Sequence, residues 1–125
     1  MQDFRKLDVW KRAVDTAIRC YSTTDVFPSS ERYGLTSQMR RSAVSIASNI
    51  AEGCGRGSSR DFARFLRIAF GSACELETQA HVAIGAEIGD RAELEALVDE
   101  AERIRRMLSS LLRSVGTSSG ESVRP

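Results

Sequence analysis

The chain contains 125 residues, of which 42% are hydrophobic and 6% aromatic, and its formal net charge is +1. This length fits a single domain with one apolar core, and the abundance of Ala, Leu, Arg and Glu favours helices over a β-sandwich. Cys20, Cys54 and Cys74 are odd in number and lack CxxC spacing, which argues against a disulfide framework and a zinc site. Signal-peptide features and runs of roughly 18 uncharged residues are missing. We therefore expect a cytoplasmic protein with no membrane contact, metal or cofactor.

The first predicted helix covers residues 4–23. Its apolar residues recur at helical spacing, with acid–base pairs four residues apart on the opposite face, and they form the stripe Trp10, Ala13, Val14, Ala17, Ile18 and Tyr21. Pro28 cannot continue a helix and disfavours helical geometry in the residue before it. The connection is therefore expected to run to about Gly34.

The second and third predicted helices cover residues 35–54 and 59–88. The second has many Ala and Ser residues between Ser42 and Ala51, which would allow a neighbouring helix to approach closely, and it ends at a glycine-rich turn at residues 53–57. The third helix begins with Ser58 or Ser59 as N-cap and has Asp61 in its first turn, where a negative charge is favourable.

The fourth predicted helix covers residues 90–115 and has nearly perfect heptad spacing of apolar residues. Residues 116–125 are expected to be a disordered tail. Short connections force sequential helices to lie antiparallel. The sequence therefore predicts an all-α domain over residues 1–115, folded as an antiparallel up-down-up-down four-helix bundle.

No catalytic residues can be assigned. The turn at residues 53–57 has neither the preceding strand nor the lysine of a phosphate-binding loop, so a helix–helix turn is the favoured interpretation. His81 is the only histidine and has no ligand set at metal spacing. Glu75 and Glu77 point about 160° apart on a helix and are not a paired acid and base, and a buried ion pair is the simpler explanation for Glu77. We expect a protein that is not an enzyme.

Charge is unevenly distributed along the chain. Residues 32–67 hold seven arginines, whereas residues 75–102 hold nine acids and one arginine. Antiparallel order would gather bases at one end of the bundle, namely Arg5, Lys6, Lys11, Arg12, Arg56, Arg60, Arg64, Arg67, Arg106 and Arg113. The far end would gather Asp25, Glu31, Glu87, Asp90, Glu93 and Glu95.

The basic end could contact a nucleic-acid backbone, because phosphate contacts require cations and no aromatic stacking. The candidate binding residues are Arg12, Arg56, Arg60, Arg64, Arg67, Arg106 and Arg113. A solvated charged surface is the competing interpretation, and pairs such as Glu102 with Arg106 would neutralise part of the charge.

Gly71 lies within the arginine stripe of the third helix, opposite its apolar face. A glycine inside a helix costs about 1 kcal/mol relative to alanine. It could mark a second packing surface where another backbone comes close, or it could simply be tolerated. The first interpretation predicts a homo-oligomer interface at Ile68, Gly71, Ser72 and Glu75.

The sequence also resembles a known family. The segments that carry the resemblance are residues 33–41, Ser45-Ile46, the NIAEG run at residues 49–53, and Arg64-Phe65-Leu66 through Gly71-Ser72 to the ELE run at residues 75–77. They resemble the four-helix-bundle proteins encoded in ribosomal RNA (23S rRNA) intervening sequences. The family is similar to the accessory variability determinant protein of diversity-generating retroelements. The match extends from about Val9 to Leu112.

This resemblance implies a ring-like homopentamer with a basic surface that binds RNA or DNA and, in the retroelement branch, a reverse transcriptase as partner. It implies no enzymatic activity. It places Arg40, Arg41, Asn49, Glu52 and Glu77 among the motif residues that hold helices or subunits in register. Ala47 stands where many relatives have proline, which would leave the second helix straighter. The near-neutral total charge also departs from the strongly basic retroelement proteins.

Two functions therefore remain open at the level of sequence. The first is a non-enzymatic homo-oligomeric bundle that binds nucleic acid through its basic end. The alternative is a protein–protein scaffold or accessory factor, for example for a reverse transcriptase, that does not bind nucleic acid directly.

Overall fold

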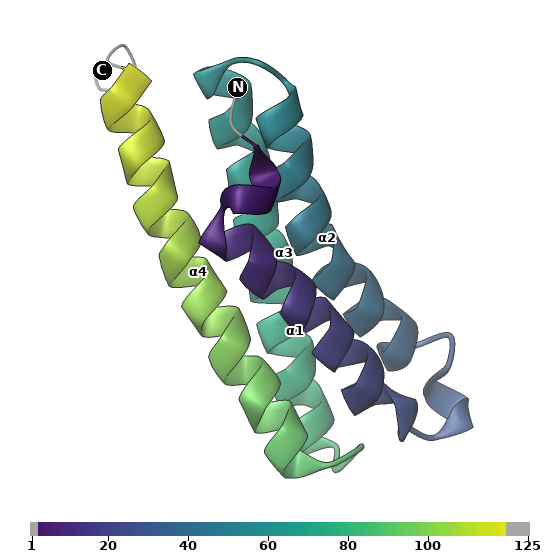
Figure 1. The fold of residues 1–125 in the computed structure, drawn as a ribbon. Helices are drawn as coiled ribbons and strands as arrows, with labels where there is room; N and C mark the ends of the chain where they lie inside the picture. The colour runs from purple at the N-terminus through teal and green to yellow at the C-terminus, as the bar shows by residue number, and fades with distance from the viewer. Residues whose placement is uncertain (1–2, 120–125) are drawn as a thin grey trace.

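The computed structural model describes residues 3–119. In this range it contains α1 (Asp8–Asp25), α2 (Leu35–Gly55), α3 (Ser59–Gly85), α4 (Arg91–Ser119) and two short 3₁₀ turns, η1 (Phe4–Lys6) and η2 (Ser29–Glu31). Successive helices run in opposite directions (Figure 1). Neighbours in the chain pack together, and α4 returns to pack on α1. The prediction of an all-α, antiparallel four-helix bundle is confirmed.

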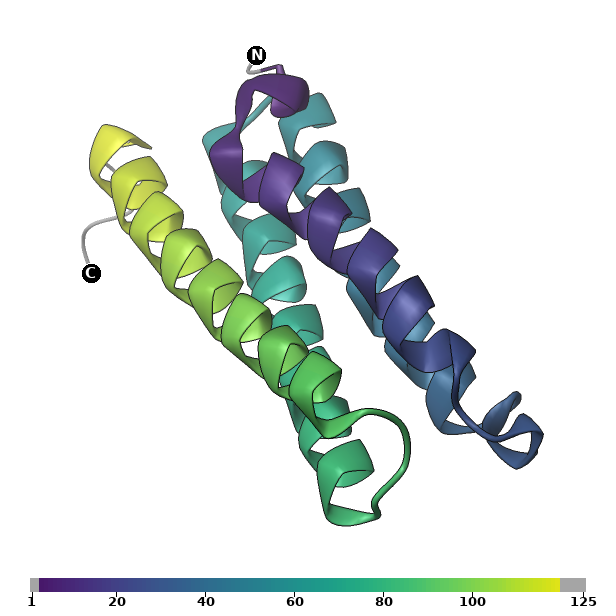
Figure 2. The same ribbon diagram turned by 60° about the horizontal axis from the view of Figure 1, so that its bottom comes forward.

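The four contacts between helices are unequal. The contacts of α3 with α2 and with α4 are extensive, whereas the α1–α4 contact is the smallest of the four. Both views show α1 and α4 closest near the start of α1 and separating towards its C-terminal end (Figures 1 and 2). The α1–α4 seam is therefore the least closed side of the bundle.

The first helix begins later than predicted. The Asp3 carboxylate accepts a hydrogen bond from the backbone N–H of Arg5, which caps η1, and Leu7 then adopts extended geometry. This extended residue separates η1 from α1, so the predicted helix from residue 4 is wrong in its first turn. The Phe4 ring packs edge-on against Trp10 with the ring centroids 5.1 Å apart.

The predicted apolar stripe of the first helix faces the core only in part. Ile18 is 64% exposed and Tyr21 48% exposed, whereas Thr16 and Cys20 are buried. Ile18 lies about 100° around the helix from Ala17, the neighbouring residue that does face the core. The prediction used apolar residues alone, but the face of α1 that contacts α2 and α4 also includes polar residues such as Thr16.

The α2–α3 turn brings these two helices very close. A Cβ atom at Gly53 would lie 2.9 Å from the Cβ of Phe65, so only glycine fits there without a shift of the backbone. Ser58 then caps α3, since its hydroxyl oxygen accepts a hydrogen bond from the Asp61 N–H at 3.1 Å. The predicted choice between Ser58 and Ser59 is settled in favour of Ser58.

The third helix ends at Gly85, three residues earlier than predicted. Glu87 has a φ of 59°, the left-handed conformation, which a continuing helix cannot contain. The Ile88 N–H donates to the Ala83 carbonyl at 2.9 Å and the Glu87 N–H donates to the Ile84 carbonyl at 3.1 Å. This pair of bonds is a Schellman C-cap.

The fourth helix extends further than predicted. Asp90 caps its start, with its carboxylate accepting a hydrogen bond from the Ala92 N–H at 3.1 Å. The helix continues to Ser119, beyond the predicted end at residue 115. Gly116 alone does not stop a helix, and no proline follows until Pro125. The rest of the predicted tail, residues 120–125, lies outside the described residues.

The core contains side chains from every α-helix. Its largest fully buried members are Met39, Ile46, Ile50, Leu66, Leu76, Leu94, Leu97, Ile104 and Leu108. None of the helices between residues 3 and 119 combines the length and apolar character that crossing a lipid bilayer requires.

Candidate nucleic-acid interface

The outer face of α3 carries three exposed arginines on consecutive turns. Arg60 and Arg67 form no ion pair with any residue between 3 and 119, and Arg64 approaches Asp61 only at 3.9 Å. The Arg64 guanidinium stacks over the Phe65 ring at 4.5 Å, and Arg56 stacks over the same ring at 5.0 Å. Because a ring face engages neither guanidinium's hydrogen-bonding edge, both arginines keep donors for a phosphate. We call Arg60, Arg64 and Arg67 the α3 arginine row.

The other four predicted binding residues are already engaged within the chain. Arg56 pairs with Glu52 at 3.0 Å, Arg106 with Glu102 at 2.7 Å and Arg12 with Glu100 at 3.1 Å. Arg113 is exposed and also has an interaction partner. The first two are exposed pairs between successive turns of one helix, whereas the third joins α1 to α4. The α3 arginine row is therefore the least neutralised part of the predicted set.

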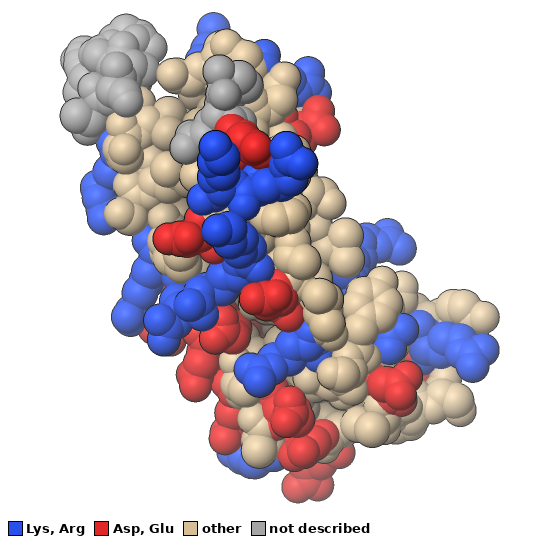
Figure 3. Space-filling view, viewed as in Figure 1, with Lys and Arg blue, Asp and Glu red and all other residues tan. Residues whose placement is uncertain are grey.

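The predicted charge polarity is present but incomplete. Figure 3 shows acidic side chains gathered at the end of the bundle with the α3–α4 turn, and basic side chains over the first turns of α1. The same view shows basic side chains over the α1–α2 connection, where Arg32 is exposed. At this end of the bundle, the acidic side chains therefore gather at the α3–α4 turn, whereas the α1–α2 connection carries basic side chains.

The predicted oligomer interface is only partly assembled. Ile68, Gly71 and Glu75 are exposed, and a Cβ atom at Gly71 would meet no other atom within 4 Å. Ser72, however, is only 6% exposed, and its hydroxyl lies 2.9 Å from that of Ser45 on α2. The placement of Ser72 on the outer face is wrong, because it lies one residue beyond Gly71, on the side of α3 that packs against α2.

The predicted motif residues occupy different environments. Arg40 joins α2 to α1, because it donates to the Thr24 hydroxyl at 2.9 Å and to the Tyr21 carbonyl at 3.3 Å. Asn49 donates to the carbonyl and the hydroxyl of Ser45, one turn earlier in the same helix.

The acidic motif residues differ in the same way. Glu77 binds Arg105 across the α3–α4 contact at 2.7 Å, whereas Glu52 pairs with Arg56 near the end of its own helix. Arg41, the remaining motif residue, is exposed. Arg40 and Glu77 are thus the two motif residues that make direct contacts between helices.

An apolar hollow between α1 and α2 was not predicted. It has a volume of about 360 Å³ and is lined by Val14, Ala17, Ile18, Tyr21, Val44, Ala47 and Ser48. Exposed apolar surface of this kind is typical of protein interaction sites. The sequence signal was present, because Ile18 and Tyr21 belong to the apolar stripe predicted for the first helix.

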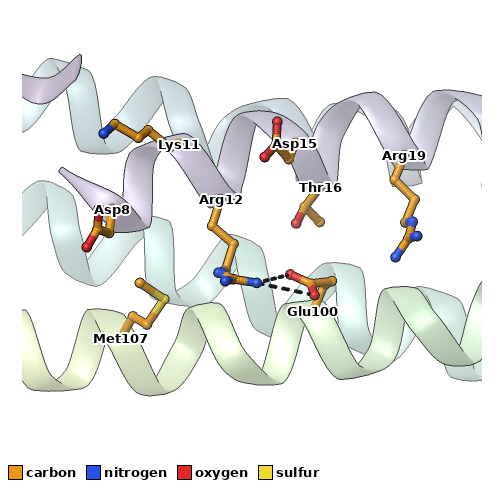
Figure 4. Close-up of a pocket in the computed structure, with 8 residues that line it drawn as sticks. All are labelled: Asp8, Lys11, Arg12, Asp15, Thr16, Arg19, Glu100 and Met107. Atoms are coloured by element: carbon orange, nitrogen blue, oxygen red, sulfur yellow. Dashed lines mark hydrogen bonds and ion pairs between the residues drawn. The ribbon is translucent and has the colours of Figure 1, made fainter. Parts of the chain in front are cut away.

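A larger polar hollow lies along the α1–α4 seam. It has a volume of about 600 Å³ and is lined by Asp8, Lys11, Arg12, Asp15, Thr16, Arg19, Glu100 and Met107. Figure 4 shows Arg12, Thr16 and Arg19 pointing from α1 towards α4, with Glu100 opposite. Of these residues, only Arg12 was among the predicted binding residues. Thr16 was not predicted, because a threonine at helical spacing gives no distinctive sequence signal.

The cysteine and histidine side chains lie in different environments. No group of three or more His, Cys, Asp or Glu side chains within residues 3–119 could hold a metal ion. Burial raises the pKa of the Cys20 thiol to about 11, and burial likewise raises that of Cys54, which keeps both sulfurs protonated and weakly nucleophilic at neutral pH. His81 is exposed on α3.

Comparison with known proteins agrees with the fold. A crystal structure of a protein of unknown function from the S23 ribosomal protein family of Bacteroides thetaiotaomicron superposes with a TM-score of 0.74 and 26% sequence identity, covering 83% of this chain and 97% of that one. No curated protein matches the chain. The family described as 23S rRNA-intervening sequence protein matches residues 5–110. With most of its length covered by this match, the chain belongs to the 23S rRNA-intervening sequence protein family.

Proposed function

We propose that this protein is a non-enzymatic, homo-oligomeric bundle of the cytoplasm that binds the backbone of nucleic acid, RNA foremost, through the α3 arginine row. The observation that carries the proposal is the unneutralised state of Arg60 and Arg67 within the described chain. Guanidinium groups on successive helical turns can follow a row of phosphates without reading bases. The family's description, which refers to an intervening sequence of 23S rRNA, makes RNA the first ligand to test.

Contact through phosphates is favoured over base stacking because Phe65, the aromatic residue beside the row, is buried. Its ring is also covered by Arg56 and Arg64. A stacking platform needs exposed rings on which successive bases can lie. Binding should therefore be tolerant of sequence and strongly dependent on salt.

The test measures RNA affinity across a salt series, with a charge-reversed variant of the row and a matched control. The double variant Arg60→Glu/Arg67→Glu should lose affinity, and its log–log salt slope should decrease by about 0.7 for each phosphate of a single strand that it no longer binds. The control Arg32→Glu/Arg41→Glu makes the same charge change at two other exposed arginines without ionic partners among the described residues. Absence of binding near physiological salt, or equal losses in both variants, would contradict the proposal.

Self-association is the second part of the proposal. Exposed Ile68 and Val82 flank the small residue Gly71 on α3, and the apolar hollow lies between α1 and α2 on another side. Two different apolar patches on one chain suit a head-to-tail contact between copies, and such contacts form a ring when the rotation between copies closes. A ring of five is the arrangement that the family resemblance implies, and light scattering with size-exclusion chromatography would measure it.

The alternative is a scaffold or accessory factor whose partner is another protein, such as a reverse transcriptase. The apolar hollow beside Ile18, Tyr21 and Val44 favours it, since it offers a docking surface remote from the arginine row. Similarity to the accessory variability determinant protein remains a prediction. A partner captured equally well after nuclease treatment and by the Arg60→Glu/Arg67→Glu variant would favour this alternative.

A further inference from the structure

The α1–α4 seam contains an unusually polar stretch for a contact between two bundle helices. Arg12, Thr16 and Arg19 follow one another at spacings of four and three residues, which places them on one face of α1. Figure 4 shows all three pointing towards α4, where Glu100 is the acidic side chain opposite them. The hollow beside them has a volume of about 600 Å³, within the range of small-ligand sites.

Thr16 is the unusual residue of this stretch. Its side chain is buried, with the residue 2% exposed, yet its hydroxyl has no hydrogen-bond partner among residues 3–119. Other helical threonines satisfy this group locally, because Thr24 and Thr78 each donate to the carbonyl four residues earlier at 2.8 Å. Buried polar groups nearly always have partners, so an orphan hydroxyl that lines a hollow suggests a missing ligand.

The charged groups around Thr16 favour an anion. Arg12 uses only Nη1 to bind Glu100, at 3.1 and 3.4 Å, and within the described chain Nε and Nη2 have no acceptor. Arg19 has no acidic partner in the same range. Figure 4 shows Lys11 and Asp15 pointing to the other side of α1 from Thr16, although both of them and Asp8 also line the hollow. The free edge of Arg12 and the Arg19 guanidinium are therefore donors that an anion beside Thr16 could engage.

We propose that the α1–α4 seam binds a phosphate group between Arg12 and Arg19. The Thr16 hydroxyl would donate to one phosphate oxygen, Arg19 would pair with the others, and Arg12 would contribute its free edge while Glu100 keeps Nη1 in place. Arginine and hydroxyl donors are the groups that proteins use for phosphate recognition. The phosphate could belong to a nucleic-acid backbone or to a small phosphomonoester, since both present the same oxygens. This site is separate from the α3 arginine row and does not rest on the proposed function.

The test follows backbone amide signals of the full chain by NMR during titration with inorganic phosphate, with dimethyl phosphate as a diester, and with chloride at equal ionic strength. The expected result is saturable shifts at Thr16, Arg19 and Glu100 with phosphate and none with chloride. Saturation by the diester would point to a nucleic-acid backbone as the source. Saturation by inorganic phosphate alone would point to a phosphomonoester.

Two variants and a matched control make the result decisive. Thr16→Val keeps the shape and removes the hydroxyl, and Arg19→Gln removes a charge at an exposed position that tolerates change. Each should weaken phosphate binding about tenfold, the loss expected for one charge-assisted hydrogen bond. Thr23→Val is the control, because Thr23 is also buried on that face with an unpartnered hydroxyl but does not line the hollow. Unchanged affinity in both variants, shifts spread over all exposed arginines, or a water alone on the Thr16 hydroxyl in a phosphate-soaked crystal would overturn the proposal.

Discussion

Arg105 on α4 donates a hydrogen bond to the carboxylate of Glu77 on α3 at 2.7 Å. The bond crosses the α3–α4 contact, which with the α2–α3 contact is one of the two most extensive in the bundle. The two side chains are only 28% and 21% exposed. The hydrogen bond to Glu77 raises the pKa of Arg105, which keeps its guanidinium charged. The pair joins residues 28 positions apart in the chain and fixes the register of the two helices.

Glu77→Gln should destabilise the protein, because it leaves a half-buried guanidinium with a neutral partner. We expect a loss of about 1–2 kcal/mol in the free energy of unfolding, measured by urea denaturation. Glu95→Gln is the control, since Glu95 forms an exposed pair with Arg91 and should cost no more than about 0.5 kcal/mol. Equal losses in the two variants would show that the α3–α4 pair contributes nothing through its burial.

Glu87→Gly should stabilise the protein. Glu87 adopts φ 59°, which costs a residue with a Cβ atom about 1 kcal/mol relative to glycine. We expect a gain of roughly 0.5–1 kcal/mol in thermal or urea denaturation, with helix content unchanged. Glu93→Gly, in the first turn of α4, should instead lose stability because it adds backbone entropy inside a helix. A loss at position 87 would mean that the side chain stabilises the turn in another way.

The stability should fall as the pH rises from about 9 to 11. Burial raises the pKa of the Cys20 thiol from 9.0 to about 11, so the unfolded chain loses this proton at a lower pH than the folded chain. Ionisation therefore stabilises the unfolded state over that window, and the stability contributed by the protonated thiol is complete below pH 9. Cys20→Ala should be less stable at neutral pH and should lose this part of the pH dependence. A parallel decline in both proteins would exclude Cys20 as its source.

Ile18→Asp should reduce self-association if the α1–α2 hollow is an interface. A charge placed in an apolar contact opposes its burial, so the molar mass by light scattering should fall towards that of one chain. Val26→Asp is the control, because Val26 is exposed at the end of α1 but does not line the hollow. If the mass of the Ile18 variant matches that of the control and the wild type, the hollow does not hold copies together.

The helices and their order were predictable because apolar periodicity and turn residues are local properties. Their ends were less so. Glu87 takes a left-handed conformation that sequence statistics reserve mainly for glycine, and Leu7 interrupts a stretch that otherwise suits a helix. The conformations of Glu87 and Leu7 depend on which backbone N–H and C=O groups need hydrogen-bond partners at the two helix ends.

The orientation of each helix about its axis was harder to predict. Ile18 and Ala17 are both apolar, and only packing against α2 and α4 decides that Ala17 is the buried one. Ser72 was placed on the outer face for the same reason, although it packs against Ser45. Charge neutralisation was also out of reach, because Arg12 finds Glu100 only when α1 and α4 lie side by side. The candidate site was therefore predicted as a set of residues, and the folded chain separates the free arginines from the paired ones.

The small, polar α1–α4 seam also has a consequence for the kinetics of folding. Its Arg12–Glu100 contact joins residues 88 positions apart, whereas the α2–α3 and α3–α4 contacts close short loops. Loop-closure entropy makes such a distant contact slow to form, and a small contact offers little compensation. We expect α2, α3 and α4 to assemble first, with α1 joining after the rate-limiting step. Changes in the seam would then alter how fast the native bundle opens and leave its rate of formation almost untouched.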